Sequence, residues 1–496
     1  MQYDISTFFD NVGRMLAYEA DHPMLFSSGL FWVLFLIFLP VYAMLRSRRQ
    51  QMVVYVVAFS LYFYYKSSAW FFMLLIITSV LDWCLSRIMS DTRKLWKRRL
   101  CLWMSIGMSL SILGFFKYAN FFLWNWNQMV EGNFQPLDII LPVGISFYTF
   151  QSISYIVDVY KGRVSPTETW IEYLFFLSYF PALVAGPIVR ADYFLPQIQN
   201  RDHASRQEMA AGLWLIILGL VKKAVVADYI AQYNDLIFAS PTGYSGLESL
   251  MGVVGYVVQI YCDFSGYSDM AIGISAIMGF RLTKNFDFPY KSRNLTDFWR
   301  RWHISLSTWL RDYVYIPMGG NRCSKPRAYF NQFSTMVIGG LWHGASWMYV
   351  IWGAIHGFLL VAHKSLKRLF PNLTVDSNVS WWRMTLNIFL TFNLVAIAFV
   401  FFRMRSLEGA AEMAHQIIYD FHPAIAPQFI IGYFTIILAL MLGYFMHFMP
   451  HRWFTNARDR FIATPFWVQA LVLALVILLI IQVRQSDLVP FIYLQY

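Results

Sequence analysis

The sequence predicts an all-α membrane protein that crosses the bilayer many times, and two observations lead to this fold class. Hydrophobic residues make up 58% of the 496-residue chain and charged residues only 14%, whereas a soluble domain averages about 25% charged residues. Apolar runs close to the length of a membrane helix, roughly 20 residues, recur along the chain. They leave no room for soluble domains between them, so we expect one membrane domain over residues 1–496.

The apolar runs predict about ten to thirteen spans. They cover residues 25–45, 52–65, 69–88, 101–122, 139–159, 171–188, 209–227, 247–262, 333–350, 351–361, 386–402, 429–449 and 466–483. Pro142, Gly144 and Pro181 fall inside such runs and predict broken or re-entrant helices. A bilayer tolerates irregular backbone only where protein or a water-filled cavity buries it.

The distribution of basic residues predicts the orientation. The net charge is +11 at pH 7, and in a membrane protein Lys and Arg collect in cytoplasmic loops, so nucleic acid is not an expected partner. If the basic clusters at residues 46–49 and 93–99 are both cytoplasmic, the two runs between them form a hairpin. Residues 1–24 then form an extracytoplasmic segment, and their sequence does not resemble a cleaved signal peptide.

The sequence contains few signs of a metal or cofactor site. The cysteines are scattered, without a Cys-x-x-Cys pair, which predicts neither a metal site nor a disulfide framework. They are Cys84, Cys101, Cys262 and Cys323. Gly-x-Ser-x-Gly, His-Glu-x-x-His and phosphate-binding loop motifs do not occur. We therefore expect no metal ion and no tightly bound cofactor.

Residues 281–331 differ from the rest because they hold ten Lys or Arg and three Asp. Apolar residues recur at three- and four-residue spacing between Leu295 and Tyr313, which predicts one amphipathic helix. Its polar face carries Arg300, Arg301, Arg311 and Asp312. We expect a basic segment on the cytoplasmic side that lies in the membrane interface or enters the bundle from it.

Two histidines are candidates for chemistry. His343 lies inside an apolar run, where an ionisable group is costly and often functional. Gly340 and Gly344 beside it allow a backbone or a thin substrate to approach closely. His303 falls at the edge of the amphipathic stripe. A buried, hydrogen-bonded core residue is the other interpretation of His343, and an interfacial residue that of His303.

Other ionisable residues carry weaker signals. Asp263 and Asp269 follow an apolar run in a Gly/Ser-rich stretch. Asp263 can orient a histidine, pair with an arginine or cap a helix, and we interpret Asp269 as structural. His356 is thirteen residues after His343, which in one continuous helix is the opposite face, so we interpret it as structural as well.

Several short motifs follow one another in the central third of the chain. They are Tyr261–Asp269, Phe298–His303 (Phe-Trp-Arg-Arg-Trp-His), Trp309–Tyr313, Tyr315–Pro317 and Leu341–Gly344 (Leu-Trp-His-Gly). Together they resemble the membrane-bound O-acyltransferases, and more closely the bacterial alginate O-acetyltransferase branch. Leu141–Phe147, Ala185–Ile188 and Pro490–Tyr493 support the resemblance, whereas residues before 100 match only in hydropathy.

The resemblance implies a ring of tilted helices around a thin centre with a funnel on each side. It also implies that His343 and His303 are the catalytic residues. A neutral imidazole, with a pKa near 6.5, can take the proton of a hydroxyl that attacks a thioester. We assign this general-base role to His343, while His303 can polarise the carbonyl, orient the donor or relay a proton.

The remaining site residues are assigned on the same basis. Asn294 and the Trp342 N–H are candidates to bind the oxyanion. Arg300, Arg301 and Arg311 suit the phosphates of coenzyme A or an acidic carrier protein, and anionic lipid is the alternative ligand. Arg322, Lys325 and Arg327 add to this basic face. Asp263 and Asp312 are orienting or structural residues.

The implied function is transfer of acetyl from a cytoplasmic thioester, acetyl-CoA, to hydroxyls of an exported polysaccharide. The implied location is the bacterial cytoplasmic (inner) membrane, with membrane lipid around the chain. The resemblance further implies an extracytoplasmic partner, an AlgJ- or AlgX-like acetyltransferase of the SGNH type. D-alanyl or other acyl transfer to a cell-wall polymer is the nearest alternative. A polysaccharide transporter without acyl chemistry is an alternative of another class.

Overall fold

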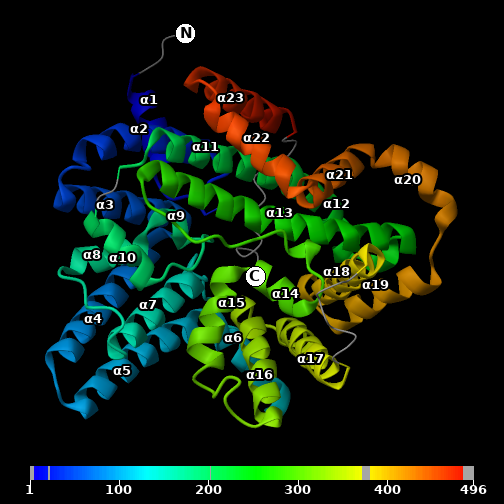
Figure 1. Ribbon diagram of the computed structural model, residues 1–496, viewed down its shortest axis with the longest axis horizontal. Coiled ribbons are helices and arrows are strands. Elements are labelled where there is room, and N and C mark those ends of the chain that lie inside the picture. Colours follow the sequence, from blue (N-terminus) through cyan, green and yellow to red (C-terminus); the bar gives the residue numbers. More distant parts are fainter. Residues whose placement is uncertain (1–4, 21–22, 201–202, 371–379, 484–496) are drawn as a thin grey trace. The chain divides into compact units, whose positions relative to one another are not determined.

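The computed structural model describes residues 5–20, 23–200, 203–370 and 380–483, and across these ranges the chain is helical and contains no strand (Figure 1). This confirms the all-α fold class. The motif Pro490–Tyr493 lies outside the described residues.

The contacts divide the chain into two compact units. Unit 1 comprises the described part of residues 1–212 together with residues 271–282, and unit 2 comprises that of residues 213–270 and 283–496. The expectation of one membrane domain stays a prediction.

Unit 1 consists of helices, and non-helical segments such as residues 131–144 and 161–169 connect some of them. They are α1 (Ile5–Leu16), α2 (Gly29–Leu45), α3 (Arg49–Ser68), η1 (Ala69–Phe71), α4 (Phe72–Asp91), α5 (Leu95–Leu113), η2 (Gly114–Tyr118), α6 (Ala119–Val130), α7 (Ile145–Tyr160), α8 (Trp170–Ser178), α9 (Phe180–Leu183), α10 (Ala191–Asn200) and the first residues of α11 (Arg206–Leu220). The end of α13 (Gly246–Met278) also belongs to this unit.

Unit 2 contains the rest of α11 and most of α13. Its other elements are η3 (Val221–Ala227), α12 (Asp228–Ala239), η4 (Pro241–Gly243), η5 (Pro289–Lys291), α14 (Leu295–Arg301), α15 (Ile304–Leu310), η6 (Arg311–Tyr315), α16 (Lys325–His343), α17 (Trp347–Leu369), α18 (Trp381–Arg403), α19 (Leu407–Tyr419), η9 (Pro423–Ile425), α20 (Ala426–Gly432), α21 (Phe434–Phe448), α22 (His451–Ala463) and α23 (Phe466–Val483).

Five helical stretches in the described part of the chain are long and apolar enough to cross a membrane. They are Arg49–Asp91, Leu95–Val130, Arg206–Ala239, Trp381–Arg403 and Phe466–Val483. The pair Pro423–Gly432 and Phe434–Phe448, bent by 90°, makes a sixth if it is one span. By length and composition this number is smaller than the ten to thirteen spans expected from about 20 apolar residues each. The runs 52–65 and 69–88 lie in one stretch, Arg49–Asp91, and several other runs form helices that are shorter or less apolar.

Proline and glycine account for part of this shortening. The run 139–159 becomes helical only at Ile145, after Pro142 and after Gly144 in a left-handed conformation with φ of +73°. The run 171–188 is divided between α8 and α9, and Pro181 lies in the first turn of α9, where its missing N–H costs no helical hydrogen bond. The prediction of broken helices at these positions is confirmed.

A buried carboxylate holds four helices of unit 1 together. Asp82 of α4 is completely buried, and hydroxyl groups from α5, α7 and α8 donate hydrogen bonds to it. The donors are Ser105 at 2.5 Å, Ser152 at 2.5 Å and Tyr173 at 3.0 Å. Since a buried polar group is costly unless it is hydrogen-bonded, these helices must keep their register.

Helices α16 and α17 of unit 2 form a tight antiparallel pair. A Cβ atom on Gly340 would lie 2.2 Å from the Tyr349 carbonyl oxygen, and one on Gly353 would lie 2.5 Å from the Met336 carbonyl oxygen. The two backbones are therefore in contact. Of the two possibilities considered for Gly340, a backbone or a thin substrate, the structure shows the backbone of α17. The expected boundary after Val350 is wrong, because α16 already ends at His343.

Replacement of Gly340 by alanine should weaken this pair. The added methyl group meets backbone rather than a movable side chain, and overpacking costs about 1–3 kcal/mol. We expect less inserted protein and a lower unfolding temperature in detergent. Gly107→Ala in α5 is the control, because nothing lies within 4 Å of its added Cβ. Equal stability of the two variants would contradict the prediction.

Candidate active site

The segment 295–313 is not one helix, and that prediction is wrong. Helix α14 ends at Arg301, α15 begins at Ile304, and His303 between them has a left-handed φ of +43°. A separate segment stabilises the break, because the Ile304 N–H donates to the Asn285 carbonyl oxygen at 2.9 Å. The spacing of apolar residues between Leu295 and Tyr313 could not predict the break, because Asn285 lies outside this segment.

The break places His303 in the protein interior. Its side chain is completely buried, and Phe264 of α13 packs against the imidazole edge to face, with ring centroids 4.6 Å apart. The ring centroid of Trp342 lies 6.0 Å away. Nδ1 of His303 lies 3.3 Å from Oδ1 of Asn285. An interfacial histidine among lipid headgroups does not fit this burial.

His343 reaches the same place from α16, of which it is the last residue. It is buried, and its ring centroid lies 6.3 Å from that of His303. Trp352 and Phe402 pack edge-on against the His343 ring at 5.1 and 5.3 Å. The structure therefore brings the two predicted histidines together inside an aromatic shell.

His356 belongs to the same aromatic cluster. The chain leaves the helix after His343 and starts α17 at Trp347, so the argument from one continuous helix is wrong. The His356 ring packs 4.8 Å from Trp352, and its Nδ1 accepts a hydrogen bond from the Trp299 indole at 3.3 Å. This contact between α14 and α17 fits the structural role that we expected.

The two candidate oxyanion donors have different environments. Asn294 is the N-cap of α14, and its Oδ1 accepts from the Asp297 N–H at 2.9 Å. Trp342 is buried beside both histidines, with its ring centroid 6.0 Å from that of His303 and 5.1 Å from that of His343. Only Trp342 lies against both imidazoles.

The predicted basic residues are not equivalent. Arg301 is half-buried and tied to Asp297 at 2.8 Å, and Arg311 pairs with its neighbour Asp312 at 2.7 Å. Arg300 is exposed and forms no ion pair with another described residue. Of the three arginines, Arg300 is therefore the one most accessible to an anionic ligand.

Asp263 pairs with a lysine, not with a histidine or an arginine. It lies within the continuous helix α13, so it caps no helix, and the Gly/Ser-rich stretch around it is helical. The Lys223 ammonium lies 2.5 Å from Asp263 and 2.7 Å from Asp228. The adjacent Lys222 pairs with Asp269 at 2.7 Å.

These two lysines are the main feature that sequence reasoning missed. They lie on η3, a π-helical stretch inside the apolar span Arg206–Ala239, and π-helical turns occur often at functional sites. The signal was present, because two adjacent lysines interrupt the run 209–227. Their partners Asp263 and Asp269 could not be predicted, because these residues lie on another helix, α13.

Helix α13 connects these ion pairs to the histidines. Asp263 precedes Phe264, which packs on His303, and Asp269 follows Ser268, whose hydroxyl accepts from Asn285 Nδ2 at 3.3 Å. At Gly266 the backbone of α13 meets Gly219, since a Cβ there would lie 2.8 Å from the Gly219 carbonyl oxygen. The position of α13 thus affects the surroundings of His303.

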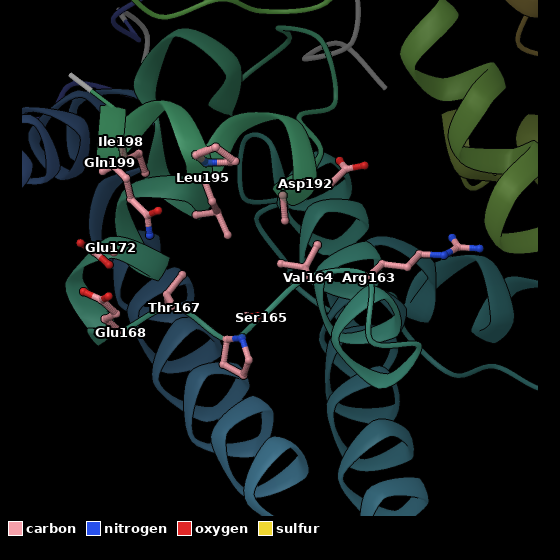
Figure 2. A pocket seen from close by; sticks show the side chains of 13 residues that line it. Arg163, Val164, Ser165, Thr167, Glu168, Glu172, Asp192, Leu195, Ile198 and Gln199 are labelled. Atoms are coloured by element: carbon pink, nitrogen blue, oxygen red, sulfur yellow. The ribbon is translucent and has the colours of Figure 1, made fainter. Parts of the chain in front are cut away.

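A separate pocket lies in unit 1 and contains none of the predicted site residues (Figure 2). Its volume is about 370 Å³, and acidic side chains are prominent in its lining. Glu168 and Glu172 lie together on one side, and Arg49 pairs with Glu172. In the described residues, no group of three or more His, Cys, Asp or Glu is placed to hold a metal ion.

The chemistry available at the histidine pair is proton transfer. A buried imidazole without an acidic neighbour is most stable uncharged, and neutral imidazole can both accept and donate a proton. The rings around the histidines are apolar, and a low local dielectric strengthens hydrogen bonds to any group that enters.

Comparison with known proteins agrees with the motifs. The model of MBOAT, the membrane-bound O-acyltransferase family, matches residues 167–404, which contain both histidines. The chain is 44% identical over 316 residues to a Pseudomonas putida protein named probable alginate O-acetylase AlgI, an alignment that covers 63% of each chain.

Two further relatives carry other names. The chain is 40% identical to the peptidoglycan O-acetyltransferase of Helicobacter pylori, over 63% of this chain and 64% of that protein. It is 32% identical to the teichoic acid D-alanyltransferase of Streptococcus thermophilus, over 52% of this chain and 68% of that protein. The chain thus spans less than two thirds of the length of the two O-acetylating relatives.

Replacement of Lys223 by methionine should destabilise unit 2. The change leaves two carboxylates without their buried cation, and breaking a buried pair costs about 3–5 kcal/mol. We expect a lower unfolding temperature in detergent and partial recovery in Lys223→Met/Asp263→Asn, which removes one of the carboxylate charges.

Lys284→Met is the control for this experiment. Lys284 also pairs with an aspartate, Asp287, but both side chains are largely exposed, so the loss should be below about 1 kcal/mol. If Lys223→Met were as mild as Lys284→Met, the ion pairs would not stabilise the fold.

Proposed function

We infer that this chain, which belongs to the membrane-bound O-acyltransferase family, transfers acetyl from a thioester to hydroxyl groups of an exported polysaccharide. The observation that carries this proposal is the buried pair of His303 and His343, whose rings lie 6.3 Å apart. Family membership supports acyl transfer, and the pair provides the base that acyl transfer to a hydroxyl requires.

The reaction is proposed to use His343 as the general base. The acceptor hydroxyl loses its proton to the imidazole as its oxygen attacks the thioester carbonyl. The new C–O bond forms, the C–S bond breaks, and the proton returns to the thiolate leaving group. Trp342, which lies against both histidines, is the better placed candidate to donate to the oxyanion.

The donor is proposed to be acetyl-CoA on the cytoplasmic side. Coenzyme A is large and anionic, and the basic residues between 281 and 331 provide positive charge where the donor would enter. Exposed Arg300 is the foremost candidate to contact a phosphate. An acidic carrier protein that bears the thioester would use the same charge.

The acceptor is proposed to be a polysaccharide in the extracytoplasmic space. Two relatives are named for O-acetylation of alginate and of peptidoglycan. We place the chain in the bacterial inner membrane with residues 1–24 outside, because basic clusters favour the cytoplasm. A secreted SGNH-type partner is proposed to complete the transfer to the polymer.

Two alternatives stay open to test. The Streptococcus thermophilus relative, named a D-alanyltransferase, supports transfer of D-alanine. Transport of a polysaccharide without acyl chemistry is the alternative of another class. Against it, Lys222, Lys223, Asp263 and Asp269 pair with one another, as charges in a structural network do.

Alanine at either histidine should abolish O-acetylation. In cells that secrete the polymer, we expect His343→Ala to lower its O-acetyl content by at least about 100-fold, the lower end for loss of a general base, and His303→Ala to lower it strongly as well. The measurement is base-released acetate per mass of polymer, at matched amounts of inserted protein.

His415→Ala is the control, because His415 is exposed on α19. Unchanged acetylation in both site variants would remove the histidine mechanism. D-alanine on the polymer of wild-type cells, in place of acetate, would favour the D-alanyltransferase alternative. Polymer export that needs the chain but carries neither group would favour transport.

Loss of Arg300 should weaken donor binding without altering the chemical step. In inverted membrane vesicles supplied with acetyl-CoA, we expect Arg300→Ala to raise KM about fivefold, which corresponds to about 1 kcal/mol for an exposed charge pair, with kcat unchanged. Arg311→Ala is the control, since its guanidinium is already occupied by Asp312. An equal effect in both variants would indicate a general charge effect.

A further inference from the structure

Asn285 joins His303 to three other groups in the interior of unit 2. It lies between α13 and η5, and only 1% of its surface is exposed. Its backbone carbonyl oxygen accepts from the Ile304 N–H, and its side chain contacts His303, Ser305 and Ser268. No part of the proposed mechanism so far uses this residue.

The surroundings fix which way the Asn285 amide points. The Ser305 backbone N–H donates to Oδ1 at 3.1 Å, and the Ser305 hydroxyl donates to it at 2.9 Å. Because a backbone N–H can only donate, the atom that receives it must be the oxygen. Nδ2 points the other way, to the Ser268 hydroxyl oxygen at 3.3 Å.

This orientation determines the tautomer of His303. Nδ1 of His303 lies 3.3 Å from Oδ1 of Asn285, and Oδ1 can only accept. Nδ1 must therefore carry the proton, and the lone pair of the neutral ring is on Nε2. Nε2 is buried and has no hydrogen-bond partner within the described part of the chain.

We propose that Asn285 is a positioning residue that makes His303 a proton acceptor through Nε2. The inference rests on the proposed acyl transfer. The proton that His343 takes from the acceptor hydroxyl passes on through Nε2 of His303 to the thiolate leaving group, while the C–O bond forms and the C–S bond breaks. Three roles are open to His303. Polarising the carbonyl and orienting the donor by a hydrogen bond to its carbonyl both need an N–H at Nε2, which this tautomer lacks, so the relay is selected.

The test compares two replacements of Asn285 in inverted membrane vesicles supplied with acetyl-CoA. Asn285→Leu keeps the approximate size but removes the acceptor for Nδ1–H. We expect kcat to fall about 10- to 100-fold, as when the hydrogen-bond partner of a functional histidine is removed, with KM for acetyl-CoA changed less than about threefold. Asn285→Asp keeps the acceptor oxygen and should retain most of the activity above its acid limb.

The pH profile of Asn285→Asp separates the relay from a carbonyl-polarising role. A carboxylate beside Nδ1–H stabilises the imidazolium, so deprotonation of His303 requires a higher pH, by about 1–3 units. If His303 works as the neutral acceptor, the acid limb of kcat moves to higher pH. If it works as a protonated donor, the basic limb moves instead, and the proposal is overturned.

Other groups that face His303 are few. Phe264 of α13, Phe286 and Trp342 surround the ring and do not titrate, and His343 of α16 is the titratable ring among its described neighbours. No charged side chain of the described residues forms a hydrogen bond or ion pair with it. The pH profile of kcat is also measured for His343→Gln, at the residual rate. A limb that persists in this variant belongs to His303.

Asn331→Leu is the matched control. Asn331 is an equally buried asparagine in α16, and its Nδ2 donates to the Met318 carbonyl oxygen at 3.1 Å, away from the histidines. We expect its kcat per inserted molecule to equal that of wild type. A loss as large as that of Asn285→Leu would overturn the proposal, because any buried asparagine would then have the same effect.

The experiment also separates failure of this inference from failure of the proposed function. If wild type consumes no acetyl-CoA above the His343→Ala background, the acyl-transfer proposal fails and the inference with it. If His343→Ala abolishes turnover while Asn285→Leu keeps it, only the inference fails. Should Asn285→Leu not insert, the direction of the pH shift in Asn285→Asp still decides.

Discussion

The buried charged side chains of Asp82, Lys222 and Lys223 are paired with other groups of the chain, and this constraint determines how their helices meet. Transfer of a charge or an unpaired polar group into an apolar interior costs several kcal/mol. Asp82 therefore draws hydroxyls from three other helices in unit 1, and Lys223 in unit 2 is held by Asp228 and Asp263. Apolar contact has no direction, whereas these pairs fix both the rotation and the register of each helix.

The same constraint applies to the candidate active site. His303 occupies a strained backbone conformation at φ of +43°, and such strain persists only where the surrounding structure enforces it. Asn285 does so by accepting from two successive N–H groups after the histidine, those of Ile304 and Ser305. The residue that bends the chain is thus also the residue that orients the imidazole, so geometry and protonation state have one physical origin.

The sequence predicted those parts of the molecule that depend on local composition. The apolar runs predicted the helical membrane fold, Pro142 and Pro181 predicted broken helices, and the motifs around His303 and His343 predicted that both would belong to the site. The break before Ile304 was not predicted, because it depends on a hydrogen bond to Asn285. Asn285 precedes the amphipathic stripe, and nothing in the sequence indicates that the two segments interact. Asp263 was left open between three roles for the same reason, since Lys223 lies on another helix.

Helix α13 shows how a structural network and a reactive group become linked. Its carboxylates Asp263 and Asp269 are bound to η3, and its residues Phe264 and Ser268 lie next to them in sequence and support His303 and Asn285. Because the carboxylates and the groups that contact His303 and Asn285 lie on one helix, the ion pairs that fix α13 also fix those contacts. Pairing offsets the cost of burying Lys222, Lys223, Asp263 and Asp269 between η3 and α13. The same pairs hold α13 where Phe264 packs against His303.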